Sequence, residues 1–226
     1  MAKLEAASEI SGGTLRINIW RHPPFVKAKG MTTTQASSEN LLARPKRADA
    51  RRNYEKVLAA AREAFAEGGE STALEEIARR ADVGIGTLYR HFPNRQALLE
   101  ALYVNEVDEV CRSAAEFEGT DAWEALSGWF ERLIGYLATK RALANELLNY
   151  LDMDAPLFHN CRASLYAAGE PLLHRAQEAG VVRPDVDFGQ VMQMVMGITK
   201  IPTSDPGQTE HILRIALDGL RYRPQA

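Results

Sequence analysis

The sequence predicts an all-α protein, with an N-terminal three-helix helix-turn-helix head and a C-terminal helical body. Three observations lead to this fold class. Apolar residues recur at helical spacing over most of residues 49–222. Short clusters rich in Gly, Pro and Asp separate the periodic segments. Two of the segments, within residues 73–91, are short and are joined by the turn Asp82-Val83-Gly84, as in a helix-turn-helix.

The first 43 residues are predicted to be a mostly disordered N-terminal extension. They contain Gly12-Gly13, Pro23-Pro24 and a tract of Thr, Ser and Gln, without a sustained helical period. Met31 is a candidate natural start, which would make residues 1–30 an upstream extension. The remainder is expected to divide into a DNA-binding head, residues 44–95, and a helical body, residues 96–226.

The head is expected to contain three helices after a short basic arm, residues 44–47. The first spans residues 49–67 and stops at a Gly pair. Thr72 is predicted to cap the second, because its hydroxyl can accept a hydrogen bond from a first-turn amide while Glu75 completes a capping box. The third, residues 85–91, ends at Pro93. A tight helical hairpin in an ordinary α-helical core would have the same spacing.

The outward side of residues 85–91 offers hydrogen-bond donors, an aromatic ring and a methyl group that suit phosphate oxygens, base edges and thymine. Gly84 and Gly86 leave no side chain to hold a sugar-phosphate backbone away. Arg95 begins a fourth helix, where the positive helix end and its own charge both attract phosphate. The candidate DNA-binding residues are Thr72, Gly84, Ile85, Gly86, Thr87, Tyr89, Arg90, His91 and Arg95.

Arg90 is the first candidate for direct base reading, since a guanidinium can make a bidentate pair with guanine. Tyr89, His91 and Arg95 are expected to hold phosphate. The charge distribution favours such a role for the head. Residues 44–95 carry 11 Lys and Arg against 8 Asp and Glu, a balance of +3, whereas residues 96–226 carry 11 against 19, a balance of −8.

Residues 83–102, VGIGTLYRHFPNRQALLEAL, strongly resemble the recognition segment of the TetR family of transcriptional repressors. The resemblance implies a homodimer whose heads bind a palindromic double-stranded DNA operator, and whose body binds a small-molecule effector that lowers DNA affinity. It implies no cofactor. Gly84 and Ile85 depart from the commonest family form, often a capping Ser or Thr and a polar residue, so the operator sequence stays open. The alternatives are a helical protein-interaction module without DNA binding and a small-molecule enzyme.

No catalytic motif stands out, since the chain lacks a GxSxG elbow, a GxxxxGK phosphate loop and an HExxH pair. Asp152, Asp154, His159 and Cys161 have no recognised metal-ligand spacing, so they are interpreted as a polar helix connection with one buried Cys. The chain has two Cys, no apolar run near the roughly 20 residues that span a bilayer, and no secretion signal. These features indicate a soluble, cytoplasmic protein that is not an enzyme.

The body is predicted to be helical over residues 96–117, 122–151, 157–179, 187–201 and 208–222, the second range being two helices or one kinked near residues 138–141. Aromatic residues at helical spacing are more often plain core, yet a subset is expected to line an apolar effector pocket. The candidates for that pocket are Leu102, Val107, Trp129, Phe130, Tyr150 and Tyr166.

The last two helices are expected to pair with their symmetry mates as a four-helix bundle. The candidate interface residues are Met192, Met196, Leu213, Leu217 and Leu220. The fourth helix is the expected route from effector to DNA, because it runs from Arg95 into the body.

Overall fold

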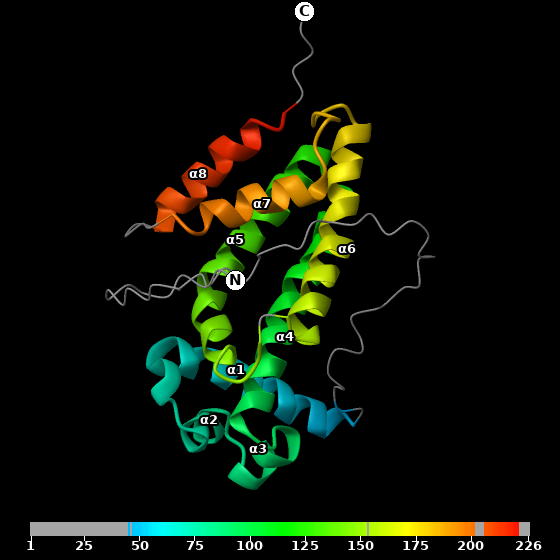
Figure 1. Cartoon of the computed structure of the whole chain (residues 1–226). Helices are drawn as coiled ribbons and strands as arrows, with labels where there is room; N and C mark the ends of the chain where they lie inside the picture. Colours follow the sequence, from blue (N-terminus) through cyan, green and yellow to red (C-terminus); the bar gives the residue numbers. More distant parts are fainter. Residues whose placement is uncertain (1–44, 46, 153, 202–205, 222–226) are drawn as a thin grey trace, which may run out of the picture.

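A three-helix head lies at one end of a larger helical body, and a long helix passes from one into the other (Figure 1). The computed structural model describes residues 45, 47–152, 154–201 and 206–221. The predicted N-terminal extension, Met31 and part of the basic arm lie outside these residues. The helices are α1 (Ala48–Gly68), η2 (Gly69–Ser71), α2 (Leu74–Arg80), α3 (Ile85–His91), α4 (Arg95–Ser113), η3 (Ala114–Phe117), α5 (Ala122–Leu147), α6 (Pro156–Glu178), α7 (Phe188–Ile198) and α8 (Pro206–Asp218).

The predicted all-α class is confirmed: within the described ranges the backbone forms helices and turns, with one isolated bridge between Val182 and Arg221. In the head, the predicted apolar face of α1 is buried against α2 and α3. Ile77 of α2 and Leu88 of α3 are fully buried in this core. These residues form the head's part of one hydrophobic core that continues into the body, and their packing fixes the angle between the two short helices.

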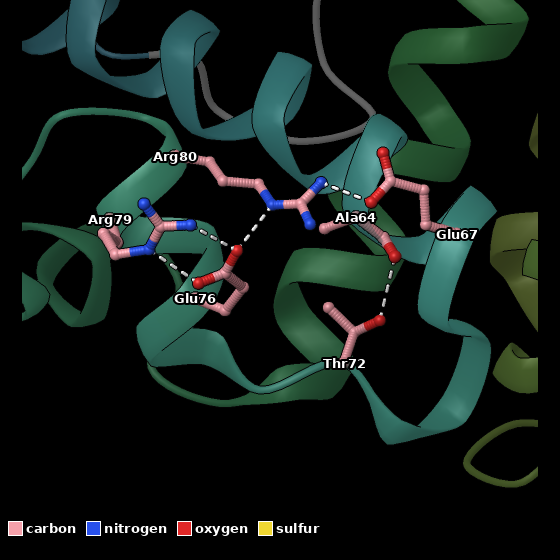
Figure 2. Close-up of polar contacts among 6 residues, drawn as sticks. All are labelled: Ala64, Glu67, Thr72, Glu76, Arg79 and Arg80. Carbon is pink, nitrogen blue, oxygen red and sulfur yellow. Dashed lines mark hydrogen bonds and ion pairs between the residues drawn. The ribbon is translucent and has the colours of Figure 1, made fainter.

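Thr72 does not cap α2, contrary to the sequence prediction. The N-cap residue is Ala73, which makes no side-chain cap, and α2 starts at Leu74. The Thr72 hydroxyl instead donates a hydrogen bond of 3.0 Å to the carbonyl oxygen of Ala64 on α1 (Figure 2). Gly68 allows this approach, because a Cβ there would lie 2.7 Å from the Thr72 hydroxyl oxygen. The buried Thr72 thus fastens the end of α1 to the segment that leads into α2.

The turn between α2 and α3 depends on an unusual backbone conformation at Asp82, whose φ is +54°. Asp tolerates this left-handed region better than most residues, since its short polar side chain can hydrogen-bond locally. The Val83 amide then donates to the Ala78 carbonyl oxygen at 3.1 Å, which closes the end of α2. This turn sends α3 across α2.

In the body, α4, α5 and α6 pack against one another, and α7 and α8 lie across α5 (Figure 1). Residues 122–147 form one helix, α5, and not two separate helices, and residues 148–150, which the sequence predicted as helical, form turns. The centre is aromatic: the Trp129 ring packs against Phe130 and Phe188. Gly169 of α6 permits this close packing, because a Cβ there would lie 2.6 Å from Trp129 and 2.3 Å from Phe188.

Candidate nucleic-acid interface

Helix α3 presents an exposed surface at the tip of the head (Figure 1). Leu88 anchors the helix inward, while Ile85 and Tyr89 are 39% and 43% exposed. These two residues are four apart, so they lie on the same side of the helix. We call the exposed set the reading face; it consists of Gly84, Ile85, Gly86, Tyr89 and Arg90.

The two glycines make the reading face low at its amino-terminal end. A Cβ at Gly84 or at Gly86 would meet no atom within 4 Å, so neither glycine is required for packing inside the chain. Without side chains, they leave the backbone open to a close approach from outside. Such access suits a sugar-phosphate chain or the edge of a base pair.

The side chain of Arg90 lies back along α3. Its guanidinium donates to the Thr87 hydroxyl at 2.9 Å and to the Gly86 carbonyl oxygen at 3.2 Å. These bonds use part of the guanidinium's donor set and hold the group over the amino-terminal half of the helix. Thr87, which the sequence proposed as a donor to DNA, is half-buried and serves here as the acceptor for Arg90.

His91 is half-buried at the end of α3, where its ring packs edge-on against Tyr54 of α1 at 6.0 Å between centroids. Burial lowers the pKa of His91 below its ordinary value, and the neighbouring Arg90 charge lowers it further. Both effects favour the neutral imidazole, which can donate one hydrogen bond.

Arg95, which the sequence predicts as a phosphate ligand, lies at the junction of head and body in this structure. Its guanidinium donates to the carboxylate of Glu146 on α5 and to the carbonyl oxygens of Thr72 and Gly69. It also lies 4.8 Å above the Phe65 ring. Thr72 itself is buried, so neither residue belongs to the reading face. The sequence missed Glu146 because nothing local connects it to a residue 51 positions earlier.

A second feature that the sequence did not assign is the Glu76 cluster on α2, defined as Glu67, Glu76, Arg79 and Arg80 (Figure 2). The Glu76 carboxylate accepts two hydrogen bonds from Arg79, at 2.7 and 2.8 Å, and one from Arg80 at 2.7 Å. These arginines lower the pKa of Glu76 to about 2. The sequence could have indicated these ion pairs, because Arg79 and Arg80 follow Glu76 by three and four residues on one helix.

The start of α1 adds a third basic region. Arg47, Arg51 and Arg52 are exposed there. Helix α1 packs on α3, and the ring of Tyr54 on α1 contacts His91 of α3. Arg51 lies 3.9 Å from Glu55, and Arg52 pairs with Asp49. Exposed arginines at the rim of a projecting helix suit contacts with phosphates on either side of a groove.

Comparison with known proteins identifies the family. Residues 57–102 match the family described as "Bacterial regulatory proteins, tetR family", and residues 121–222 match "Transcriptional regulator SbtR-like, C-terminal domain". The TetR transcriptional regulator SCO0520 from Streptomyces coelicolor has 37% sequence identity and a TM-score of 0.66, covering 74% of this chain and 98% of that one. This chain belongs to the TetR family. It is a transcriptional regulator with an N-terminal DNA-binding domain.

Other relatives agree with this TetR-family assignment. A TetR transcription regulatory protein from Mycobacterium vanbaalenii has 34% identity and a TM-score of 0.66, covering 79% of this chain and 100% of its own. The HTH-type transcriptional regulator UidR from Escherichia coli (strain K12) is 24% identical over 149 residues, which are 64% of this chain and 76% of the relative. Regulators of the TetR family bind DNA operators and act as dimers.

Most candidates for a TetR-type effector site lie in the core of the body. Trp129 and Phe130 are fully buried, and the Trp129 indole donates to the Val110 carbonyl oxygen of α4 at 3.1 Å. Tyr150 is 44% exposed in the turns after α5, so it lies outside this core, contrary to the prediction. The other candidates, Leu102, Val107 and the half-buried Tyr166, accompany the two large rings between α4, α5 and α6.

The predicted dimer-interface residues are buried within the protomer itself, and their role in a dimer stays a prediction. The side chains of Leu213, Leu217 and Leu220 on and after α8 are at most 7% exposed, because α8 packs onto α5 and α7. Met192 and Met196 are buried on α7 in the same way. The outer surface here instead exposes Ile215 and Ile201, at 60% and 42%.

The described residues were also considered for membrane-spanning helices and for metal-binding groups. None of the helices there combines the length and apolar composition needed to cross a membrane. The side chains described also contain no group of three or more His, Cys, Asp or Glu arranged to hold a metal ion. Of the residues weighed earlier as a metal cluster, His159 contacts Arg162 at 2.7 Å.

Proposed function

We propose that this TetR-family protein is a homodimeric repressor, released from a palindromic operator by a small molecule bound in its helical body. The reading face of α3 carries this proposal. It combines a projecting helix, two bare glycines, an arginine and two exposed large side chains, and the buried Leu88 holds the helix against the core. We further propose that residues 44–95 form the DNA-binding unit, that residues 96–226 form the effector and dimer unit, and that the protein acts in the cytoplasm.

In the proposed complex, α3 lies in the major groove and the flanking cations contact phosphate. The exposed Arg51 and Arg52 at the start of α1 lie beside α3. Arg79 on α2 is 73% exposed despite its bonds to Glu76. Arginines on both neighbouring helices would thus contact the DNA backbone while α3 reads the base edges.

Within the reading face, we assign direct base recognition to Arg90 and Ile85. The Arg90 guanidinium needs only to swing off Thr87 and Gly86 to reach the N7 and O6 acceptors of guanine. Ile85 offers an exposed apolar surface to the C5-methyl group of thymine. Tyr89 lies on the same side, where its ring and hydroxyl suit either a thymine or a phosphate.

For the effector we propose the core of the body formed by α4, α5 and α6, the helices that carry Leu102, Val107, Trp129, Phe130 and Tyr166. Its aromatic composition favours an apolar or aromatic small molecule. Helix α4 borders this region and begins in the head, at Arg95. A molecule inserted beside α4 would therefore displace the helix that carries the reading head.

Selection of duplexes from a random-sequence DNA pool with the full-length protein tests the proposed function. We expect a palindrome to be enriched, bound more tightly than a scrambled duplex, and weakened steeply by added salt, because phosphate contacts release counterions. Equal binding of selected and scrambled duplexes, or no binding at all, would contradict a sequence-specific regulator. It would favour a module that contacts protein through the same face.

Arg90→Ala tests the assignment of base reading on the selected duplex. We expect a loss of about 1–3 kcal/mol of binding free energy and a relaxed preference at one base pair of each half-site. The matched control is Arg214→Ala, which removes an exposed arginine from α8 in the body. Affinity and base preference are measured by fluorescence anisotropy over duplexes that carry each base in turn. Unchanged base preference in Arg90→Ala would remove this residue from direct recognition.

A further inference from the structure

Arg95 connects the parts of the head to one another. It is the first residue of α4, and its guanidinium donates to the carbonyl oxygens of Thr72 and Gly69, in the segment between α1 and α2. It also stacks on Phe65, near the end of α1, at 4.8 Å. A planar guanidinium with several donors suits such simultaneous contacts. The orientation of this side chain is therefore fixed by the head.

Glu146 brings the body to the same point. It lies in the last turn of α5, and its side chain is only 7% exposed, compared with 21% for Arg95. One carboxylate oxygen of Glu146 accepts hydrogen bonds from two nitrogens of Arg95, at 2.7 Å from Nε and 2.5 Å from Nη2. Close charge-assisted hydrogen bonds between groups shielded from water are directional and are weakly screened by salt.

The pair is one of several connections between head and body besides the continuous backbone of α4, because Arg62 of α1 pairs with Glu106 and Glu109 of α4 and α1 also packs on α5. Helix α5 ends where α4 begins, so the two partners lie on opposite sides of the junction (Figure 1). The other connections run from α1, whereas this pair joins the start of α4 and the segment between α1 and α2 to the end of α5. A turn of the head about the start of α4 would pull the guanidinium away from the buried carboxylate, so the pair resists that motion.

We propose that Arg95 and Glu146 are positioning residues, which set the angle of the head on the body and so the separation of the two reading helices in the dimer. This inference rests on the proposed function. Two heads reach successive major grooves only when their recognition helices are about 34–36 Å apart. A head held at one angle accepts one half-site spacing, whereas a head that turns about α4 accepts several.

The competing role for Arg95 is the one expected from its sequence position, a direct contact with DNA phosphate. Phosphate binding and positioning predict different effects on DNA affinity, on its salt dependence and on its dependence on half-site spacing. Loss of a phosphate contact weakens binding to every sequence and spacing and reduces the salt slope by about one. Loss of a positioning contact leaves single half-sites and the salt slope unchanged, and alters only the dependence on spacing.

The experiment uses the full-length dimer and the palindrome selected from random DNA, with the spacing of its half-sites lengthened or shortened by one and two base pairs. We expect the wild-type protein to bind one spacing best. Glu146→Gln removes the charge but keeps the size of the side chain, and should reduce the penalty for a changed spacing by about five-fold or more, the lower end of common coupling strengths. Its affinity for a duplex with one half-site should equal that of the wild type.

Three further variants make the result specific. Arg95→Gln should show the same flattened spacing profile, and combining it with Glu146→Gln should add nothing, since both break one contact. Glu131→Gln is the control: it makes the same change on α5 at an exposed residue that lies 4.0 Å from Arg214. Arg95→Lys keeps a cation beside the buried carboxylate but lacks the guanidinium fork, so it provides a folded variant if Glu146→Gln is unstable.

A wild-type spacing profile in folded Glu146→Gln, or in Arg95→Lys should Glu146→Gln not fold, would overturn the inference. A loss of half-site affinity in Arg95→Gln with a reduced salt slope would overturn it in favour of phosphate binding. Failure to select any palindrome would contradict the proposed function itself, and the inference with it.

Discussion

One carboxylate, Glu76, accepts hydrogen bonds from two arginines on the same short helix, and this arrangement controls the charge that α2 presents. Arg80 also contacts Glu67 of α1 at 2.8 Å, so its charge is directed back into the head. Arg79 remains largely exposed. The cluster thereby distinguishes two adjacent arginines: Arg80 joins the helices of the head, whereas Arg79 is available to a partner.

The titration of Glu76 tests this arrangement. Its pKa is lowered from 4.5 to about 2, chiefly by the hydrogen bonds from Arg79 and then by those from Arg80. A carboxyl group with a lowered folded-state pKa stabilises the fold above its unfolded pKa, and that contribution is lost as the pH falls toward the folded value. We expect the Glu76 carboxyl carbon to titrate near pH 2 by NMR, and Arg79→Gln to raise the midpoint. A wild-type midpoint near 4.5 would contradict the cluster.

Ile85 gives a prediction about DNA sequence. We expect the exposed side chain of Ile85 to pack on a thymine methyl group. Replacing that thymine with deoxyuridine removes only the methyl, and should cost about 0.8 kcal/mol of binding free energy, the typical contribution of burying one CH2 group. In Ile85→Ala the same base change should cost nothing further. Anisotropy titrations of both proteins with both duplexes measure the coupling. An undiminished uridine penalty in Ile85→Ala would assign the methyl contact to another residue.

At the scale of helices, periodicity predicted which segments are helical, because an apolar stripe requires burial wherever it occurs. The same stripe could not tell an internal surface from a partner surface. Leu213 and Leu217 of α8 have the spacing expected of an interface, yet they pack against α5 and α7 of their own chain. Burial inside the protomer and burial at a dimer interface both require apolar residues. Which of the two applies to α8 depends on how the helices pack, and a local sequence pattern does not contain that information.

Polar contacts were predicted less well than helices, for a related reason. Asn94 has a capping residue type at the start of α4 and does cap this helix, because the hydrogen bond that it accepts from the Ala97 amide is local. Thr72 also has a capping residue type, but its hydroxyl bonds to Ala64 on the preceding helix. Arg95 has a suitable position for phosphate, but its partner Glu146 comes from the far end of α5. Contacts between distant segments decide these roles.

The outer surface of α8 supplies the prediction about assembly. Ile215 is 60% exposed and points away from the protomer core, so we expect it to contact the symmetry mate in the dimer. Ile215→Glu should bury an unpaired charge at that interface and yield monomers in sedimentation velocity. Leu213→Ala should instead lower the free energy of unfolding by about 2–5 kcal/mol through a cavity, while folded molecules stay dimeric. A dimer of wild-type strength in Ile215→Glu would remove α8's outer surface from the interface.

For the molecule as a whole, α4 is held to α5 at two levels. Near its start, Arg95 binds Glu146; near its end, the Val110 carbonyl oxygen accepts the hydrogen bond from Trp129. Both partners belong to α5. A change in the packing of α5 against α4 therefore reaches the reading head through contacts at each end of one rigid helix. The proposed effector region lies between these two contacts, bordered by Leu102 and Val107.

This arrangement predicts reciprocal coupling between effector and operator. The test begins with a thermal-shift screen of small apolar and aromatic compounds, followed by a search among the hits for one that releases the selected duplex. An energetic coupling of about 1–3 kcal/mol would give a 5- to 150-fold loss of DNA affinity, and linkage requires the duplex to weaken ligand binding by the same factor. Trp129→Phe keeps an aromatic ring but removes the hydrogen bond to α4, so it should reduce this factor more than it changes DNA affinity without ligand. Calorimetry of the ligand against free and DNA-bound protein measures both quantities. Equal ligand affinity for the two forms would show that the body serves dimerisation and does not transmit a signal to the head.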